Sequence, residues 1–319
     1  MTDPIHSHTL RDGQTEITVL SIGCAVQDWR VAGRRVVLGR SNVEDYRTNP
    51  GYLGAVVGRL ANRVAGARFM LDGQEVVLTP NEGTNQLHGG PQGFGTRNWR
   101  MTPEGERSVL LELTSEDGDM GYPGRVEVSV RMTLEGAALT WDMTAVPDRE
   151  TPIALAQHTY FNIAGEGDVR DHLLRIAADH VTPTGPDLIP TGDLLDVTGT
   201  RYDFRAARTI AEADPEGEGY DLNFALAGEG PQAEVMANGM RLRLWTDQPG
   251  LQVYTSGNLA PAGTPFADVV HGPFAGICLE AQGFPNAVNT PAFPPVFCAP
   301  DRPYRQVTTV EIAPEASRG

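Results

Sequence analysis

Hydrophobic and polar residues alternate along much of this chain with a period of two. In residues 125–135, valine, methionine and leucine occupy every second position, and polar or charged residues fill the positions between them. After Gly136 the alternation resumes in residues 139–144. Such a pattern predicts a hairpin of two β-strands, each with one buried face and one exposed face.

Two further hairpins are indicated by the dipeptides Asp72-Gly73 and Asn238-Gly239, which suit the two positive φ angles of a type I′ turn. The strands that flank them are predicted at Arg68–Leu71, Gln74–Leu78, Glu234–Ala237 and Met240–Trp245. The same criteria predict strands at Glu16–Ile22, Ala25–Val31, Ser108–Thr114, Leu173–Val181, Leu251–Thr255, Gly276–Leu279 and Val307–Ile312.

Helical periodicity is almost absent, and only Ala206–Ala213 is predicted as a short helix. Strands and helices do not alternate, which argues against a doubly wound parallel sheet. No repeat, linker or change of composition marks a domain boundary. We therefore predict an all-β protein, a large antiparallel β-sandwich with few short helices. It forms a single domain over residues 1–319, with loose ends at about 1–12 and 314–319.

Charge narrows the possible functions. The 319 residues include 41 acidic and 25 basic side chains, a net charge of −16, and every basic residue is arginine. Without lysine, the chain has no ε-amine for a Schiff-base mechanism and no P-loop lysine. The acidic balance argues against a nucleic-acid partner, because binding to phosphate backbones needs clustered basic residues.

The cysteines and the hydropathy pattern predict a soluble, cytoplasmic protein. Three cysteines, Cys24, Cys278 and Cys298, do not suggest a disulfide framework and fit a reducing compartment. The N-terminal residues have no signal-peptide pattern, and no apolar run approaches the ~18 residues of a membrane span. We expect no membrane partner.

Reactive polar side chains gather in five segments rich in glycine, asparagine and aromatic residues: 58–63, 81–90, 157–162, 220–224 and 279–289. Taken singly, each has a structural interpretation; His158 follows an apolar run and could be an ordinary buried histidine. Glu280 also adjoins an apolar run, where a carboxylate needs a partner or a raised pKa. Neither a His-Glu-x-x-His motif nor a Cys-x-x-Cys pair is present, so we expect no metal.

Taken together, the segments resemble the aldose 1-epimerase (galactose mutarotase) family, in the family's order. The matching stretches run from about residue 50 to residue 312 and read GAVVGRLANRVAG, NEGTNQLHGG, QHTYFNIAG, IPTGDLLDVTGTRYDFR, YDLNF, LQVYTSGN and CLEAQGFPNAVNTPAFPPV. The resemblance implies a galactose mutarotase-like supersandwich fold, which agrees with the predicted strands.

The resemblance also implies a role for each matching residue. His158 corresponds to the general acid and Glu280 to the general base. The positions that contact the sugar are Asn62, Arg63, His88, Asp221 and Gln252, whereas Arg59 gives structural support. The partner would be a small aldose whose α and β anomers are interconverted, without a cofactor.

Ring opening requires removal of the proton from the C1 hydroxyl and protonation of the ring oxygen. A carboxylate and an imidazolium suit these tasks near neutral pH. We therefore expect His158 charged and Glu280 ionised, each stabilising the other in one cleft.

Three alternatives remain open. A non-catalytic sugar-binding β-sandwich would not need an acid–base pair. A hexose-6-phosphate 1-epimerase would need clustered arginines for the phosphate. A glycoside hydrolase or lyase would need two suitably spaced carboxylates.

Overall fold

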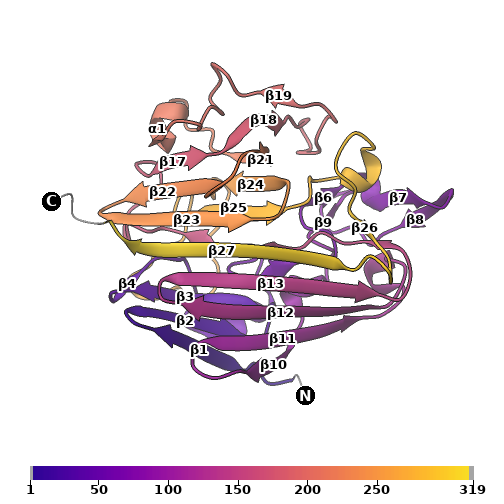
Figure 1. Cartoon of the computed structure of the whole chain (residues 1–319), viewed down its shortest axis with the longest axis horizontal. Helices are drawn as coiled ribbons and strands as arrows, with labels where there is room; N and C mark the ends of the chain where they lie inside the picture. Colours follow the sequence, from indigo (N-terminus) through magenta and orange to yellow (C-terminus); the bar gives the residue numbers. More distant parts are fainter. Residues whose placement is uncertain (1–2, 316–319) are drawn as a thin grey trace.

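A nine-stranded antiparallel sheet forms one layer of the molecule. The computed structural model describes residues 3–315. In spatial order the strands of this sheet are β10 (Arg100–Pro103), β11 (Ser108–Ser115), β12 (Val126–Glu135), β13 (Ala138–Pro147), β27 (Tyr304–Pro314), β23 (Met240–Thr246), β22 (Ala233–Ala237), β17 (Leu173–Ile176) and β20 (Arg208–Thr209). Its long strands run across the front of Figure 1.

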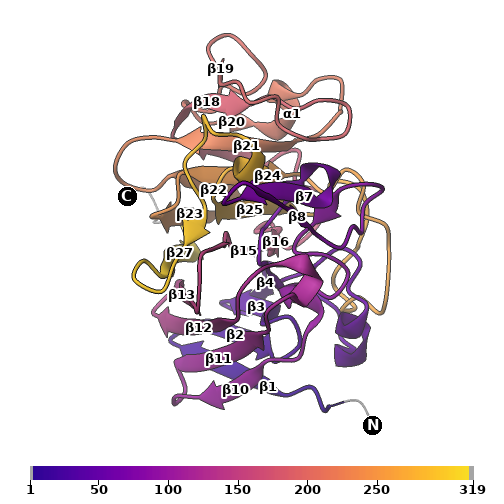
Figure 2. The ribbon, with the colours of Figure 1, turned by 90° about the vertical axis from the view of Figure 1, so that its right-hand side faces the viewer.

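Two smaller sheets form the opposite layer. One contains, in order, β16 (Tyr160–Phe161), β25 (Ile277–Gln282), β24 (Gly250–Tyr254), β21 (Asp221–Leu226), β18 (Ala178–Thr182) and β19 (Leu195–Asp196). The other contains β1 (Ser7–Asp12), β2 (Thr15–Leu20), β3 (Ala25–Val31) and β4 (Arg34–Arg35). Figure 2 shows the two layers from the side, with β1–β4 to the right of β10–β13, and β21, β24 and β25 to the right of β22 and β23.

The remaining elements are short. Two-stranded pairs join β14 (Thr151–Pro152) to β26 (Phe297–Cys298), β15 (Ala156–Gln157) to β5 (Val56–Val57), β6 (Arg63–Val64) to β9 (Gln86–Leu87), and β7 (Arg68–Leu71) to β8 (Gln74–Val77). The α-helix α1 covers Ile210–Ala213. Single 3₁₀ turns cover Val43–Arg47, Ala65–Ala67, Phe94–Thr96, Asp119–Gly121 and Ala287–Asn289.

One hydrophobic core joins the two layers. The buried faces of β12 and β13 contribute Val128 and Trp141, and the indole of Trp141 lies 6.2 Å from that of Trp29 in β3. At the other end, Leu242 of β23 and Leu279 of β25 belong to the same buried cluster. Burial of these alternating apolar side chains is the dominant stabilising term of such a fold.

The predicted fold class and hairpins are confirmed. The β12–β13 hairpin has the predicted alternation of buried and exposed residues. Asp72 and Gly73 both have positive φ, as do Asn238 and Gly239. The predicted helix is shorter than expected and begins at Ile210, where Thr209 and Glu212 form a capping box.

Two predictions differ from the structure. The single strand predicted at Leu173–Val181 is two strands, β17 and β18, because the chain crosses from one layer to the other at Ala177. Within the N-terminal end that we expected to be loose, residues 7–12 form β1 and pair along their whole length with β2. At the other end Pro314 still belongs to β27, and residues 316–319 lie outside the described residues.

No helix formed by residues 3–315 is long and apolar enough to cross a membrane.

Candidate active site

An open cavity of about 350 Å³ lies beside the six-stranded sheet. It brings together six of the seven predicted site residues: Asn62, Arg63, His88, His158, Asp221 and Glu280. They come from segments that are far apart in the sequence. The seventh, Gln252, does not line this cavity in the described part of the chain. It is buried and donates a hydrogen bond to Asp221.

The strand period places Glu280 in this cavity. In β25 the side chains of Ile277, Leu279 and Ala281 enter the hydrophobic core. Because successive side chains of a strand point to opposite faces, Glu280 faces the other way. Its cross-strand partner is Gln252 in β24, whose own partner is Asn223 in β21. The sheet thus presents a row of polar side chains on the cavity side.

His158 stands next to Glu280. Its Nε2 atom lies 3.7 Å from Glu280 Oε1, and both residues are almost completely buried. The imidazole stacks on the ring of Tyr160 at 5.1 Å, and its Nδ1 atom is 3.5 Å from the Sγ atom of Cys278. The second carboxyl oxygen of Glu280, Oε2, is buried without a hydrogen-bond partner among the described residues. Glu280 thus lines the cavity with hydrogen-bonding capacity that no described residue uses.

The expected charge state of this pair needs correction. Burial lowers the pKa of His158 to about 4 and raises the pKa of Glu280 well above its ordinary value. Both shifts favour neutral side chains, because two charges removed from water are not compensated by a contact of 3.7 Å without a hydrogen bond. The neutral pair nevertheless contains one transferable proton, the same number as the ion pair expected from the sequence.

Asn62 and His88 hold each other through two hydrogen bonds. The backbone N–H of His88 donates to the Asn62 carbonyl at 3.0 Å, and the backbone N–H of Asn62 donates to Nδ1 of His88 at 3.1 Å. Since Nδ1 accepts a hydrogen bond, the proton of the neutral imidazole must be on Nε2. Burial, followed by the nearby His158, lowers the pKa of His88 well below its ordinary value. His88 is therefore a fixed neutral donor.

Local backbone geometry explains the glycine after His88. His88 and Asn62 both have positive φ, a conformation in which histidine and asparagine are enriched. Gly89 also has positive φ, and a Cβ atom there would lie 1.9 Å from the carbonyl oxygen of Gly58. Only glycine allows the two segments to approach closely enough for the His88–Asn62 contacts.

Three side chains could be considered as metal ligands. Ligand atoms of His88, His158 and Glu280 lie within 4.8 Å of one another. However, His88 carries its proton on Nε2, and its Nδ1 lone pair already accepts the Asn62 N–H. A metal bound to Nε2 would leave the imidazole proton on Nδ1, which could then no longer accept the Asn62 N–H. This donor set therefore fits a metal poorly.

Arg63 and Asp221 belong to a chain of charged contacts. The guanidinium of Arg63 makes two hydrogen bonds to Glu82, at 2.7 and 2.9 Å, and its Nη1 atom lies 3.7 Å from Asp221 Oδ2. Gln252 donates to Asp221 Oδ1 at 2.6 Å. Burial raises the pKa of Asp221, whereas Arg63 and Gln252 oppose that increase. Gln252 therefore orients Asp221.

Arg59 anchors the segment that carries Asn62 and Arg63. Its buried guanidinium donates from Nε to the hydroxyl of Ser115 at 2.9 Å. The other two nitrogens donate to three backbone carbonyls in and after β11, those of Ser115, Glu116 and Pro123. One side chain thus ties the cavity-forming segment to the nine-stranded sheet.

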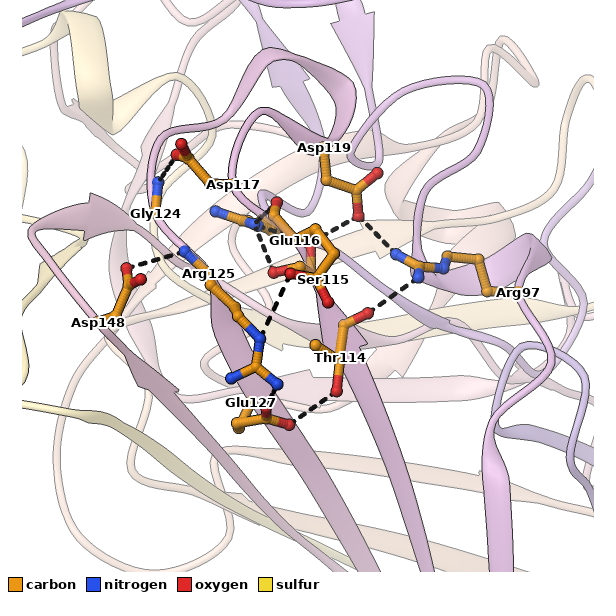
Figure 3. Close-up of polar contacts among 11 residues, drawn as sticks. Arg97, Thr114, Ser115, Glu116, Asp117, Asp119, Gly124, Arg125, Glu127 and Asp148 are labelled. Carbon is orange, nitrogen blue, oxygen red and sulfur yellow. Dashed lines mark hydrogen bonds and ion pairs between the residues drawn. The ribbon is translucent and has the colours of Figure 1, made fainter.

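The loop after β11, whose carbonyls accept hydrogen bonds from Arg59, is also held by other polar contacts. The hydroxyl of Ser115 donates to the carboxylate of Asp119 at 2.7 Å, and Asp119 also pairs with Arg97. The backbone N–H of Gly124 donates to Asp117 at 2.6 Å. Figure 3 shows this network around the loop after β11. These contacts add to those of Arg59 in holding the loop.

Replacing Arg59 by Met is expected to lower the free energy of unfolding by roughly 2–4 kcal/mol, because several buried acceptors lose their donor. Urea unfolding would measure the change. Arg131→Met is a suitable control, since its paired guanidinium is about half exposed and such pairs contribute about 0–1 kcal/mol. Equal losses in the two variants would contradict the anchoring role.

Sequence reasoning missed several residues of the cavity. Glu82 lies within one of the matching stretches but was not expected in the site, and neither were Tyr52, Tyr160 and Tyr254. Tyr52 packs edge-on against His88 at 4.6 Å between ring centres. The signal for Glu82 was present in the sequence, because an acidic residue shares a glycine- and asparagine-rich segment with His88.

The fold and the site define a class: a large antiparallel β-sandwich with a buried histidine–carboxyl pair in an open cavity. Comparison with known proteins makes the assignment specific. The sequence model of the family described as Aldose 1-epimerase matches residues 6–311. The chain therefore belongs to the aldose 1-epimerase family, and the predicted isomerase class is confirmed.

Individual relatives agree with this assignment. Galactose mutarotase of Rattus norvegicus is 38% identical, over 95% of this chain and 93% of the relative. Aldose 1-epimerase of Escherichia coli K12 is 36% identical, over 93% and 90%. A crystal structure of an aldose epimerase homologue from C. elegans superposes with a TM-score of 0.93 at 25% identity, covering 98% of this chain and 100% of that one.

Proposed function

We propose that this protein interconverts the α and β anomers of free aldoses, with His158 and Glu280 as its acid–base pair. The observation that carries the proposal is the buried contact of 3.7 Å between His158 Nε2 and Glu280 Oε1, in a cavity that also contains the polar side chains of Asn62, Arg63, His88 and Asp221. The names of the relatives, galactose mutarotase and aldose 1-epimerase, support the same reaction.

Binding of the sugar would shift the His158–Glu280 pair from its neutral form to the ionised form. A C1 hydroxyl that donates to the carboxyl group of Glu280 stabilises the carboxylate, and a ring oxygen that accepts from His158 Nε2 favours the protonated imidazole. The single proton of the pair would then lie on His158. Glu280 removes the hydroxyl proton while His158 protonates the ring oxygen, and the roles reverse for closure on the other face.

The remaining polar residues have positioning tasks in this scheme. The Nε2–H of His88 donates a hydrogen bond toward the reacting atoms, with a geometry fixed by Asn62. Asp221 and Arg63 suit sugar hydroxyls, which both donate and accept hydrogen bonds. None of these steps uses a redox group or a covalent intermediate.

The pH dependence of kcat/KM should reflect the protonation state of the His158–Glu280 pair. Because the pKa of His158 is lowered to about 4, the one-proton state persists through neutral pH, and a second proton is added only in more acidic solution. We expect kcat/KM to be level from neutral pH down to about pH 5 and to fall below about pH 4. A half-maximal rate near the ordinary histidine pKa would contradict this. Circular dichroism at each pH would confirm that the protein is folded.

Polarimetry tests the proposed activity directly. Freshly dissolved α-anomers of galactose, glucose, arabinose, xylose and fucose would be followed with and without the protein, and the panel would also identify the preferred sugar. Acceleration of at least one aldose is expected. Sugar binding without acceleration would instead favour the non-catalytic sugar-binding alternative.

We also propose a single domain and a cytoplasmic location. The domain proposal is supported by one hydrophobic cluster that includes residues from Leu10 to Ile312. The location is supported by the three cysteines, all of which are free thiols.

A further inference from the structure

Acidic residues outnumber basic residues in the lining of the cavity. Among its described lining residues, Arg63 is the only one with a guanidinium or ammonium group, whereas Glu82, Asp221 and Glu280 are acidic. A lone arginine in a sugar cavity could serve as a binding site for a carboxylate or a phosphate, because its planar fork binds both in a bidentate manner.

That fork is already filled. Nε and Nη2 of Arg63 donate to the two carboxylate oxygens of Glu82 at 2.7 and 2.9 Å. The third nitrogen, Nη1, faces Asp221 at 3.7 Å. Acidic side chains thus occupy two sides of the guanidinium, and an anionic ligand would have to displace one of them.

Glu82 is itself held in place. Its backbone forms hydrogen bonds in both directions with Asn85, which closes a tight loop. Its side chain is 37% exposed, and that of Arg63 is 10% exposed, so the carboxylate covers the arginine from the solvent side. The charge of Glu82 also contributes, after burial, to the raised pKa of Asp221, so it acts within the cavity.

We propose that Glu82 is a specificity-determining residue that excludes anionic aldoses, namely uronic acids and sugar phosphates, by saturating Arg63 and placing a carboxylate on the solvent side of the guanidinium. The inference rests on the proposed epimerase function and adds a substrate boundary to it. Neutral sugars are unaffected by this barrier, because their hydroxyls carry no charge to be repelled.

The test compares Glu82→Gln with a matched control, Glu104→Gln. Glu104 also binds an arginine, Arg131, through both carboxylate oxygens, and its side chain is 34% exposed, but it is not among the cavity-lining residues. Both substitutions change the net charge of the protein equally. Rates of mutarotation of D-galacturonate and D-galactose would be measured at neutral pH for the wild type and both variants.

In Glu82→Gln, the ratio of kcat/KM for galacturonate to that for galactose should rise about tenfold, as expected for one nearby charge. In Glu104→Gln the ratio should stay within about twofold, because distant exposed charges are screened. Glu82→Asp, which keeps the charge, should retain most of the selectivity. An unchanged ratio in Glu82→Gln, or equal increases in Glu82→Gln and Glu104→Gln, would overturn the proposal.

Calorimetric binding of the two sugars provides a second readout that does not need turnover. If Glu82→Gln is too slow to assay, the ratio of the two dissociation constants should still shift toward galacturonate. Loss of binding of both sugars would show that Glu82 only positions Arg63, and would overturn the specificity role. A wild type that binds galactose without accelerating its mutarotation would contradict the proposed function instead, and the binding ratio would still decide the role of Glu82.

Discussion

His158→Ala is expected to lower turnover by about a thousandfold while changing sugar affinity by about tenfold or less. In the proposed mechanism the imidazole proton is needed when the ring oxygen takes up charge, and loss of a general acid costs about 10²–10⁴ in rate. In the bound ground state His158 contributes one hydrogen bond among several, and losing one costs roughly 0.5–1.5 kcal/mol, or up to about 3 with a charged donor.

Polarimetry for the rate and calorimetry for the affinity, on the same preparation, would separate the two effects. His172 offers a matched control, because it is a buried histidine whose pKa is also lowered to about 4 and it is not among the cavity-lining residues. His172→Gln should retain turnover per folded molecule. If His158→Ala lost affinity and turnover in equal proportion, His158 would be a binding residue rather than the acid.

Glu280→Gln should lower turnover at least about a hundredfold, the scale of one general-base contribution. The amide keeps the size of the side chain and its hydrogen bonding, but it cannot accept the C1-hydroxyl proton. Since burial already favours the neutral form of Glu280, we expect the free energy of unfolding at neutral pH to be unchanged or higher in the variant.

Denaturant unfolding and polarimetry together test both halves of this prediction. Glu234→Gln makes the same chemical change at a residue of β22 that pairs with Arg175 away from the cavity, and should leave turnover unchanged. Turnover near that of the wild type in correctly folded Glu280→Gln would exclude Glu280 as the base. A large loss of stability would show that its carboxylate is needed for folding.

Much of the fold follows from local sequence. The β12–β13 hairpin could be predicted because alternation of apolar and polar residues directly reflects the two faces of a strand. Asp72-Gly73 and Asn238-Gly239 could be placed as turns because few residues tolerate their positive φ angles. The proposed site residues were selected by resemblance, since no single motif has a spacing that specifies the chemistry.

The features of the fold that could not be predicted depend on contacts between distant segments. Nothing in the local pattern marks Ala177 as the point where the chain changes layers, because both β17 and β18 are β-strands. β1 is held by its partner β2, and pairing, more than intrinsic propensity, decides whether a short polar segment is ordered.

The sequence by itself determined the all-β class, the main hairpins and, through its motifs, the acid–base pair expected of an aldose 1-epimerase. Only the tertiary structure revealed that burial favours the neutral form of both members of that pair, that Nδ1 of His88 accepts a hydrogen bond, and that Glu82 saturates Arg63. The physical reason is that burial and hydrogen-bond geometry set pKa values and available donors, and both arise when segments separated by tens to hundreds of residues meet around one cavity.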